Sequence, residues 1–118
     1  MQRDPRVLLH DVGQALARIR RFVQGRAFVD YVADELLRSA VERQLAIVGE
    51  ALWRLRSIDP SAAAGIRDLE RIVAFRHVLV HGYASVDEKL VWGVIESRLD
   101  DLGSDVSACL AALDADDS

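Results

Sequence analysis

Apolar residues recur three and four positions apart along nearly the whole chain, which is the spacing that gathers side chains on one face of an α-helix. The first such segment begins at Asp4-Pro5 and ends at Gly25. Aspartate is suited to the position that caps a helix, proline to its first turn, and glycine to the residue that follows its end. The pattern therefore predicts a first helix between these signals.

The same periodicity resumes at about Tyr31 and continues to Ile58 without a proline or paired glycines. Asp59-Pro60 ends it, because proline disfavours helix in the residue before it. A helix of this length in a small domain is expected to be its central spine. Gly49 lies in its interior, where glycine costs about 1 kcal/mol relative to alanine. We expect a neighbouring helix to pass close to Gly49, and therefore close to Glu50.

The remaining sequence predicts a small-residue linker at 62–65, a third helix from about Ile66 to Val80 that ends at Gly82, and a last helix. Residues 85–88 form a Ser-x-x-Glu capping box, which marks the start of the last helix. Apolar periodicity continues past Gly103, which either kinks this helix or divides it. The fold predicted is an all-α, antiparallel bundle of four to five helices.

Length and composition are those of one globular domain, residues 1–118, with an acidic tail at about 114–118. Apolar residues make up 51% of the 118 residues and charged residues 29%, which argues against a disordered chain. The single cysteine, Cys109, excludes an internal disulfide and a cysteine-based zinc site. No apolar run reaches membrane length and no leader pattern opens the chain, so the expected compartment is the cytoplasm.

The formal net charge of −4 is unusual for a protein that holds nucleic acid by its backbone, because such proteins normally present a basic face. The negative charge argues against a general nucleic-acid-binding protein. It does not exclude an enzyme that contacts RNA only at its active site. For such an enzyme we expect the arginines to gather on one face, with Arg67, Arg71 and Arg76 together.

Candidate chemistry is concentrated in residues 75–83, where Arg76, His77, His81 and Tyr83 fall within nine positions. A guanidinium group binds phosphate oxygens with a planar set of donors, and an imidazole exchanges protons near neutral pH. These groups suffice for RNA cleavage without a metal: a base removes the proton of the ribose 2′-hydroxyl, an acid protonates the leaving oxygen, and a cation stabilises the charged phosphorus centre. The alternative is a capped helix end with ordinary surface cations.

On a regular helix, five positions correspond to about 500°, so Arg76 and His81 point roughly 140° apart. Either the helix breaks before His81, or two copies of the chain assemble the site around a two-fold axis. His77 and His81 have the four-residue spacing of helical zinc ligands, but no third ligand accompanies them. We therefore expect no metal or other cofactor, and a supporting or RNA-contacting role for His77.

Arg43 and Glu50 are seven positions apart and so share one face of the predicted spine. That face is either solvated surface, or it supplies a carboxylate that orients an arginine or histidine of the site.

Four segments together resemble the HepT-like toxins of the HEPN superfamily. Residues 75–83 resemble the family's Arg-x(4–6)-His motif in its Arg-Asn-x-x-x-His-x-Tyr form, with His77 in place of the usual asparagine. Residues 40–51 resemble its Ala-Val-x-Arg-x-Leu-x-Ile-Ile-Gly-Glu-Ala segment, residues 11–22 its first helix, and residues 86–92 the Val-Asp…Val-Trp start of its last helix. The resemblance covers about residues 6–113.

The resemblance implies a dimerising helical bundle in which two Arg-x4-His motifs share a cleft that acts as a metal-independent endoribonuclease. It implies that His81 is the acid/base, that Arg76 binds the phosphate, and that Tyr83 is modified with AMP by an antitoxin, a nucleotidyltransferase of the MntA type. The RNA target and the number of AMP units stay open. The alternative function is a non-catalytic helical module that binds a nucleotide or the partner protein.

Overall fold

The computed structural model describes residues 4–82 and 86–116, and within them every regular element is an α-helix. The helices are α1 (Pro5–Val23), α2 (Phe28–Ala33), α3 (Glu35–Ile58), α4 (Pro60–Ala63), α5 (Leu69–His81) and α6 (Glu88–Asp116). The predicted all-α fold is confirmed. The predicted Ile66 start of the third helix is three residues early, because Asp68 adopts a left-handed conformation (φ 57°) before α5.

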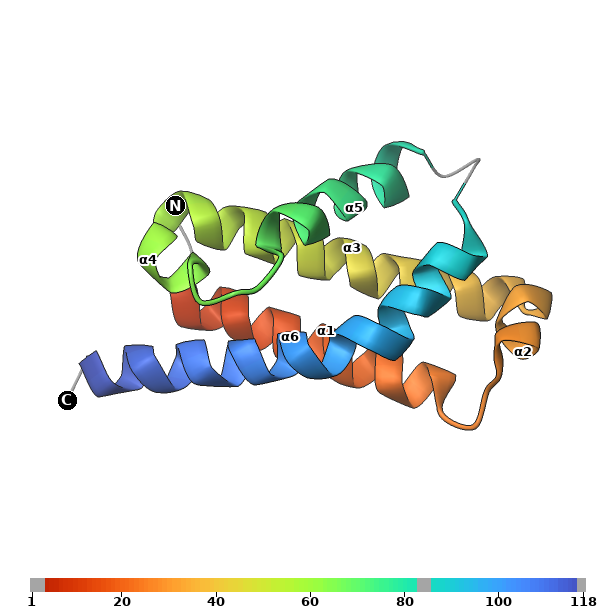
Figure 1. The fold of residues 1–118 in the computed structure, drawn as a ribbon, viewed down its shortest axis with the longest axis horizontal. Helices are drawn as coiled ribbons and strands as arrows, with labels where there is room; N and C mark the ends of the chain where they lie inside the picture. The colour runs from red at the N-terminus through yellow and green to blue at the C-terminus, as the bar shows by residue number, and fades with distance from the viewer. Residues whose placement is uncertain (1–3, 83–85, 117–118) are drawn as a thin grey trace.

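The long helix α3 runs through the middle of the molecule, as predicted for the spine (Figure 1). Helix α1 packs along one side of it and α5 along another, while α6 lies mainly against α1 (Figure 1). The start of α1 and the end of α6 meet at one end of the bundle, where Arg6 Nε lies 3.3 Å from Asp114 Oδ1. The antiparallel layout therefore brings the two ends of the chain together.

The core consists of the apolar stripes of α1, α3 and α6. Fully buried side chains among them include Leu9, Val12, Ile19, Val41, Leu52, Leu55 and Val91. Burying one such side chain contributes about 1.5–3 kcal/mol relative to leaving it in water. The three-and-four periodicity of the sequence thus corresponds to the buried face of each helix.

Capping residues define the ends of α1 as the sequence predicts. The Asp4 side chain accepts a hydrogen bond from the Arg6 backbone N–H at 2.8 Å, and Pro5 occupies the first turn. The helix ends at Val23, and Gly25 follows with a positive φ of 72°. That conformation costs glycine little, because it has no Cβ to clash with the backbone.

The predicted spine from Tyr31 is wrong at its start, because the helix is interrupted at Asp34. Asp34 adopts an extended conformation, and its side chain accepts a hydrogen bond from Leu37 N at 3.0 Å. Aspartate competes for backbone N–H groups in this way, and here it separates the short helix α2 from α3. The apolar periodicity continues across the break, which is why the sequence pattern does not reveal it.

Two further differences concern the later helices. The expected linker at 62–65 begins inside a short helix, α4, because Asp59 caps it through a hydrogen bond from Ala62 N at 3.0 Å. Helix α6 is continuous across Gly103. It begins at Glu88, two residues later than the capping box at 85–88 predicts, because Asp87 caps it by accepting a hydrogen bond from Lys89 N at 2.9 Å. Ser85 lies outside the described residues.

Tyr31 is fully buried against Trp92, with 5.4 Å between their ring centroids. Within residues 4–82 and 86–116, no group hydrogen-bonds to its hydroxyl oxygen. Burial, followed by the charge of Glu42, raises the pKa of this phenol, so the hydroxyl stays neutral. A buried hydroxyl without a partner costs about 1–3 kcal/mol of stability.

We expect Tyr31→Phe to raise the free energy of unfolding by about 1 kcal/mol, because it removes the unpaired hydroxyl and keeps the ring. Urea denaturation followed by circular dichroism measures this change. Phe28→Tyr, which adds a hydroxyl to the neighbouring ring at the same interface, serves as the reverse control. A Tyr31→Phe protein less stable than wild type would mean that the hydroxyl has a partner in solution.

Candidate functional site

Helix α5 presents the candidate residues on different sides. Arg76 faces α3, whereas His77 and His81 lie on the solvent-exposed side of the helix. The helix continues through His81 and is capped by Gly82, whose N–H donates to the Val78 carbonyl at 2.7 Å. The alternative that the helix breaks before His81 is therefore wrong. Arg76 and His81 of one chain diverge, as the helical spacing requires.

The expected close approach to Gly49 is present, and the helix that makes it is α5. A Cβ atom added to Gly49 would overlap the Cβ and Cγ of Arg76. The root of the Arg76 side chain thus lies directly against the α3 backbone. Glycine at this position allows the contact, because any side chain would push the two helices apart.

This contact carries the Arg76 guanidinium group to Glu50, the next residue of α3. Arg76 Nη2 lies 2.7 Å from Glu50 Oε2. The other carboxylate oxygen, Oε1, accepts a hydrogen bond from Arg54 Nε at 2.9 Å. One carboxylate therefore holds two guanidinium groups, and both side chains of the Arg76–Glu50 pair stay about one-third exposed, at 30% and 34%.

These groups line a surface groove of about 320 Å³ between α1, α3 and α5, called here the Arg76 groove. Its charged lining consists of Asp11, Arg43, Glu50, Arg54 and Arg76. Its apolar lining consists of Leu8, Ala46, Ile47, Ala51 and Val80. Three cations face two carboxylates, so the groove has a net positive charge in a protein that is acidic as a whole.

The groove brings Arg43, Glu50 and Arg76 together, and adds Arg54 and Asp11, which sequence reasoning missed. Arg54 follows Glu50 by four positions, a spacing at which helical side chains meet. The sequence therefore indicates the pairing of Arg54 with Glu50. It does not indicate that Arg76 joins this pair, because that contact depends on where α5 crosses α3.

The two histidines form a separate pair on the exposed side of α5. Their ring centroids lie 4.5 Å apart, with the rings inclined by 46°. Neither ring lines the Arg76 groove. Tyr83, the expected modification site, lies outside the described residues.

Among the described residues, no group of three or more histidine, cysteine, aspartate or glutamate side chains is arranged to hold a metal ion. None of the helices described is both long and apolar enough to cross a membrane.

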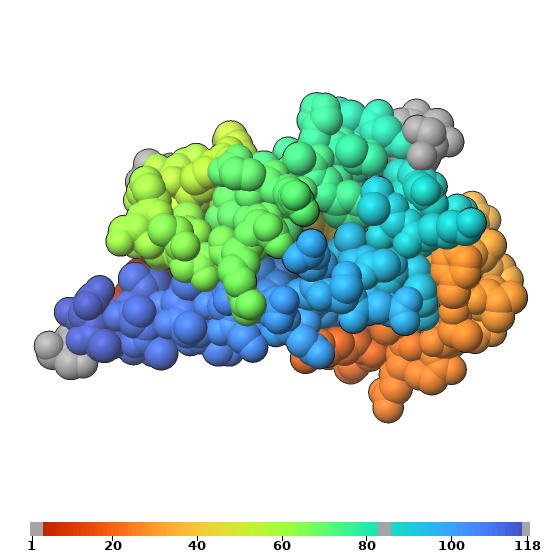
Figure 2. All heavy atoms as spheres, in the orientation of Figure 1, coloured from red at the N-terminus to blue at the C-terminus, as the bar shows by residue number. Residues whose placement is uncertain are grey.

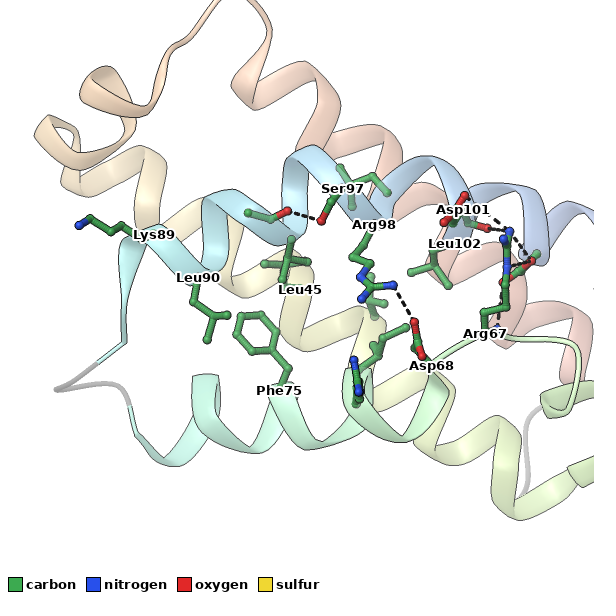
Figure 3. Close-up of a pocket in the computed structure, with 17 residues that line it drawn as sticks. Leu45, Arg67, Asp68, Phe75, Lys89, Leu90, Ser97, Arg98, Asp101 and Leu102 are labelled. Atoms are coloured by element: carbon green, nitrogen blue, oxygen red, sulfur yellow. Dashed lines mark hydrogen bonds and ion pairs between the residues drawn. The ribbon is translucent and has the colours of Figure 1, made fainter.

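A second groove of about 460 Å³ lies on the other side of α5, between α5 and α6 (Figure 2). Phe75 and Leu90 point toward each other across it, and Leu45 of α3 contributes to its floor (Figure 3). Arg67 and Arg71 line this groove and not the one that holds Arg76. The expectation of one arginine face is therefore wrong, because positions 67 and 71 of the chain turn toward α6.

Arg67 is bound to α6 through Asp105, which accepts from the Arg67 backbone N–H at 2.9 Å and from its Nε at 3.1 Å (Figure 3). Burial of the Asp105 carboxyl works against its ionisation, but the hydrogen bonds and charge of Arg67 outweigh that effect and lower the pKa of Asp105. Arg98 is paired in turn with Asp68, with 2.7 Å between Nη1 and Oδ2. These arginines thus tie the chain before α5 to α6.

Comparison with known proteins identifies the family. Residues 12–108 match the family described as "Ribonuclease HepT-like". A probable ribonuclease HepT of Thermococcus cleftensis is 27% identical over 106 residues, covering 86% of this chain and 92% of that protein. A putative RNase of Caldanaerobacter subterraneus subsp. tengcongensis is 28% identical over 106 residues, covering 90% and 94%. No solved structure gives a significant match.

Gly49→Ala tests the contact on which the Arg76 groove depends. We expect it to lower the free energy of unfolding by about 1–2 kcal/mol, because overpacking against the root of the Arg76 side chain outweighs the roughly 1 kcal/mol gain in helix propensity. Urea denaturation measures the change.

Gly13→Ala in α1 is the matched control, since nothing lies within 4 Å of a Cβ added there. We expect it to be neutral or stabilising, because only helix propensity changes. Equal effects of the two substitutions would contradict the tight contact at Gly49.

Proposed function

The chain belongs to the HepT-like ribonuclease family of the HEPN superfamily, and from this premise we propose that it is the toxin of a toxin–antitoxin pair, a metal-independent endoribonuclease. Ribonuclease activity is named for its relatives from Thermococcus cleftensis and Caldanaerobacter subterraneus. The finer parts of the proposal rest on the arrangement of Arg76 and His81.

The observation that carries the proposal is the continuity of α5 through His81. Arg76 is held in the groove by Glu50, while His81 lies on the exposed side of the helix. The two groups can act on one phosphate only if a second copy of the chain supplies one of them. We therefore propose a homodimer in which Arg76 of one copy and His81 of the other form each site.

The exposed face of α5 offers a surface for this pairing. Val78 is 44% exposed and lies between His77 and His81. Covering an apolar side chain beside the two imidazoles favours association. A dimer contact along this face brings the His81 of one copy toward the α5 helix of the other.

In the proposed reaction, His81 removes the proton from a ribose 2′-hydroxyl, and the 2′ oxygen forms a bond to the adjacent phosphorus. The bond from phosphorus to the 5′ oxygen breaks, and a protonated imidazole gives that oxygen a proton. The products are a 2′,3′-cyclic phosphate and a 5′-hydroxyl. Arg76 stabilises the additional negative charge on the phosphate oxygens, because its guanidinium group binds them in a fixed orientation.

We assign supporting roles to Glu50, Arg43 and His77. Glu50 orients Arg76 through the 2.7 Å ion pair. Arg43 lines the same groove and adds positive charge to it. His77, whose ring centroid lies 4.5 Å from that of His81, contacts RNA or holds the His81 ring in position.

We further propose that a nucleotidyltransferase antitoxin of the MntA type neutralises the protein by attaching AMP to Tyr83. The modified residue follows His81 by two positions in the sequence. An added phosphate brings negative charge close to the catalytic histidine and repels the RNA backbone.

A non-catalytic binding module is the second candidate, and one observation favours it. The Arg76 guanidinium group already has a carboxylate partner in Glu50, and no histidine shares its groove. In this alternative, Arg76 and His81 contact phosphate or a partner protein without cleaving a bond.

We expect His81→Ala to lower the rate of RNA cleavage in EDTA by about 100- to 10,000-fold, the usual effect of losing an acid/base group. The assay compares cleavage of total cellular RNA and tRNA by wild type and variant, after both are shown to be folded and of equal size in solution. Equal activity, or none from wild type free of AMP, would support the binding-module alternative.

Mixing Arg76→Ala with His81→Ala tests the shared site. Each mixed dimer then contains one site with an intact arginine and an intact histidine, so about a quarter of the wild-type activity returns when the copies exchange freely. Restoration requires exchange, which size measurements on differently tagged copies verify. If mixed dimers form and no activity returns, each site lies within one copy.

We expect Tyr83→Phe to keep ribonuclease activity and to escape neutralisation, because phenylalanine has no hydroxyl to accept AMP. Incubating wild type with the nucleotidyltransferase and ATP should add the mass of at least one AMP, and incubating the variant should add none. Modification of the variant, measured by intact-protein mass spectrometry, would mean that another residue is the target.

A further inference from the structure

The carboxylate of Glu50 binds two guanidinium groups but neutralises only one positive charge. Its two oxygens each engage a different guanidinium group, Arg76 at 2.7 Å and Arg54 at 2.9 Å. One negative charge therefore lies between two positive charges. With Arg43 and Asp11 included, the groove has three cations and two carboxylates, and a bound anion can share the remaining positive charge.

Both guanidinium groups keep donors for such an anion. Arg54 uses its Nε and Arg76 one Nη for Glu50, and each guanidinium group has five N–H donors in all. Over the part of the chain that the structure describes, neither makes another ion pair. Glu50 thus orients the two groups while it leaves most of their donors available.

A structural role alone accounts poorly for Arg54. Its pairing with Glu50 is a surface contact between residues four apart on one helix, and such exposed pairs contribute little to stability. The link between α3 and α5 is already made by Glu50 and Arg76. The second arginine adds charge to the groove and no further link between the helices.

Arg43 extends the positive charge along the same helix. It precedes Arg54 by 11 positions, which corresponds to about three turns and a separation of roughly 16 Å along the axis. Both residues line the Arg76 groove, with Ala46 and Ile47 between them. A cationic row with an apolar floor suits a single strand, whose phosphates meet the arginines while its sugars and bases contact the apolar surface.

We propose that Arg54 is a second phosphate-binding residue of the site, and that a single RNA strand follows α3 from the Arg54–Arg76 pair toward Arg43. This inference rests on the proposed ribonuclease function, and it names single-stranded RNA backbone as what the groove takes. Arg76 binds the reacting phosphate, Arg54 the phosphate beside it, and Arg43 one farther along the strand. Glu50 is the positioning residue that holds the two guanidinium groups side by side.

The test measures binding separately from cleavage. The probe is a fluorescent single-stranded oligonucleotide of about 12 nucleotides with 2′-O-methyl riboses, long enough to follow the groove and unable to undergo attack by a 2′-hydroxyl. Fluorescence anisotropy gives its Kd for the full chain at several salt concentrations, and unmodified RNA of the same sequence is assayed for cleavage in parallel.

We expect Arg54→Gln to raise the Kd about tenfold and to reduce the slope of log Kd against log salt concentration by about 0.7, the value for one lost phosphate contact on a single strand. Arg43→Gln should reduce the slope similarly. Arg54→Lys should restore the slope, because it restores the charge. A merely structural role for Arg54 would leave the slope unchanged.

Arg56→Gln is the matched control. Arg56 lies on the same helix and pairs with Glu70 of α5, but it does not line the Arg76 groove. The control variant therefore loses a surface ion pair of an α3 arginine, as Arg54→Gln does, and it should bind the probe as wild type does. Thermal unfolding checks that all variants are folded.

The outcomes separate the two proposals. If wild type cleaves unmodified RNA and Arg54→Gln binds the probe like Arg56→Gln, the ribonuclease function stands and the role of Arg54 is wrong. The same conclusion follows if Arg54→Gln weakens binding with an unchanged salt slope. If wild type neither binds the probe nor cleaves RNA, both proposals fail.

Discussion

The contact of α5 with α3 at Gly49 determines where the candidate chemistry lies. Because the residue has no side chain, the root of Arg76 rests on the α3 backbone, and its guanidinium group reaches the carboxylate of the adjacent Glu50. A larger residue would separate the helices and remove the ion pair. Gly49 thus determines how closely Arg76 approaches α3 and which carboxylate its guanidinium group binds.

That contact also divides the surface of α5 between two grooves with different chemistry. Both grooves have an apolar floor. The Arg76 groove is small and cationic, whereas the groove between α5 and α6 is larger and has two of its arginines, Arg67 and Arg98, paired with carboxylates. A protein with a formal charge of −4 can therefore offer a positive site to RNA, because its acidic groups lie mostly elsewhere. Net charge describes the whole molecule, while a phosphate responds to the few charges within a Debye length of it.

Much of the fold follows from local rules that can be read along the chain. Asp4-Pro5, Asp59-Pro60 and Gly82 mark helix ends in the structure, because capping and proline effects involve only neighbouring residues. The same rules failed at Asp34, where a side-chain hydrogen bond interrupts a helix whose apolar periodicity continues. They also fail at Ala62–Gly65, where the small residues predict a linker but Ala62 and Ala63 belong to α4.

For the site, the sequence by itself determined the helical spacing, and with it the divergence of Arg76 from His81, because the angle between two residues of one helix depends only on their separation. It also determined that Glu50 and Arg43 share a face. Only the tertiary structure decided that Arg76 binds the same carboxylate, Glu50, as Arg54 does, and that Arg67 and Arg71 turn toward α6 instead. Those contacts join residues more than 20 positions apart. Gly49 predicts that a helix passes close to it, but no local pattern identifies which helix that is or which of its residues meets Glu50.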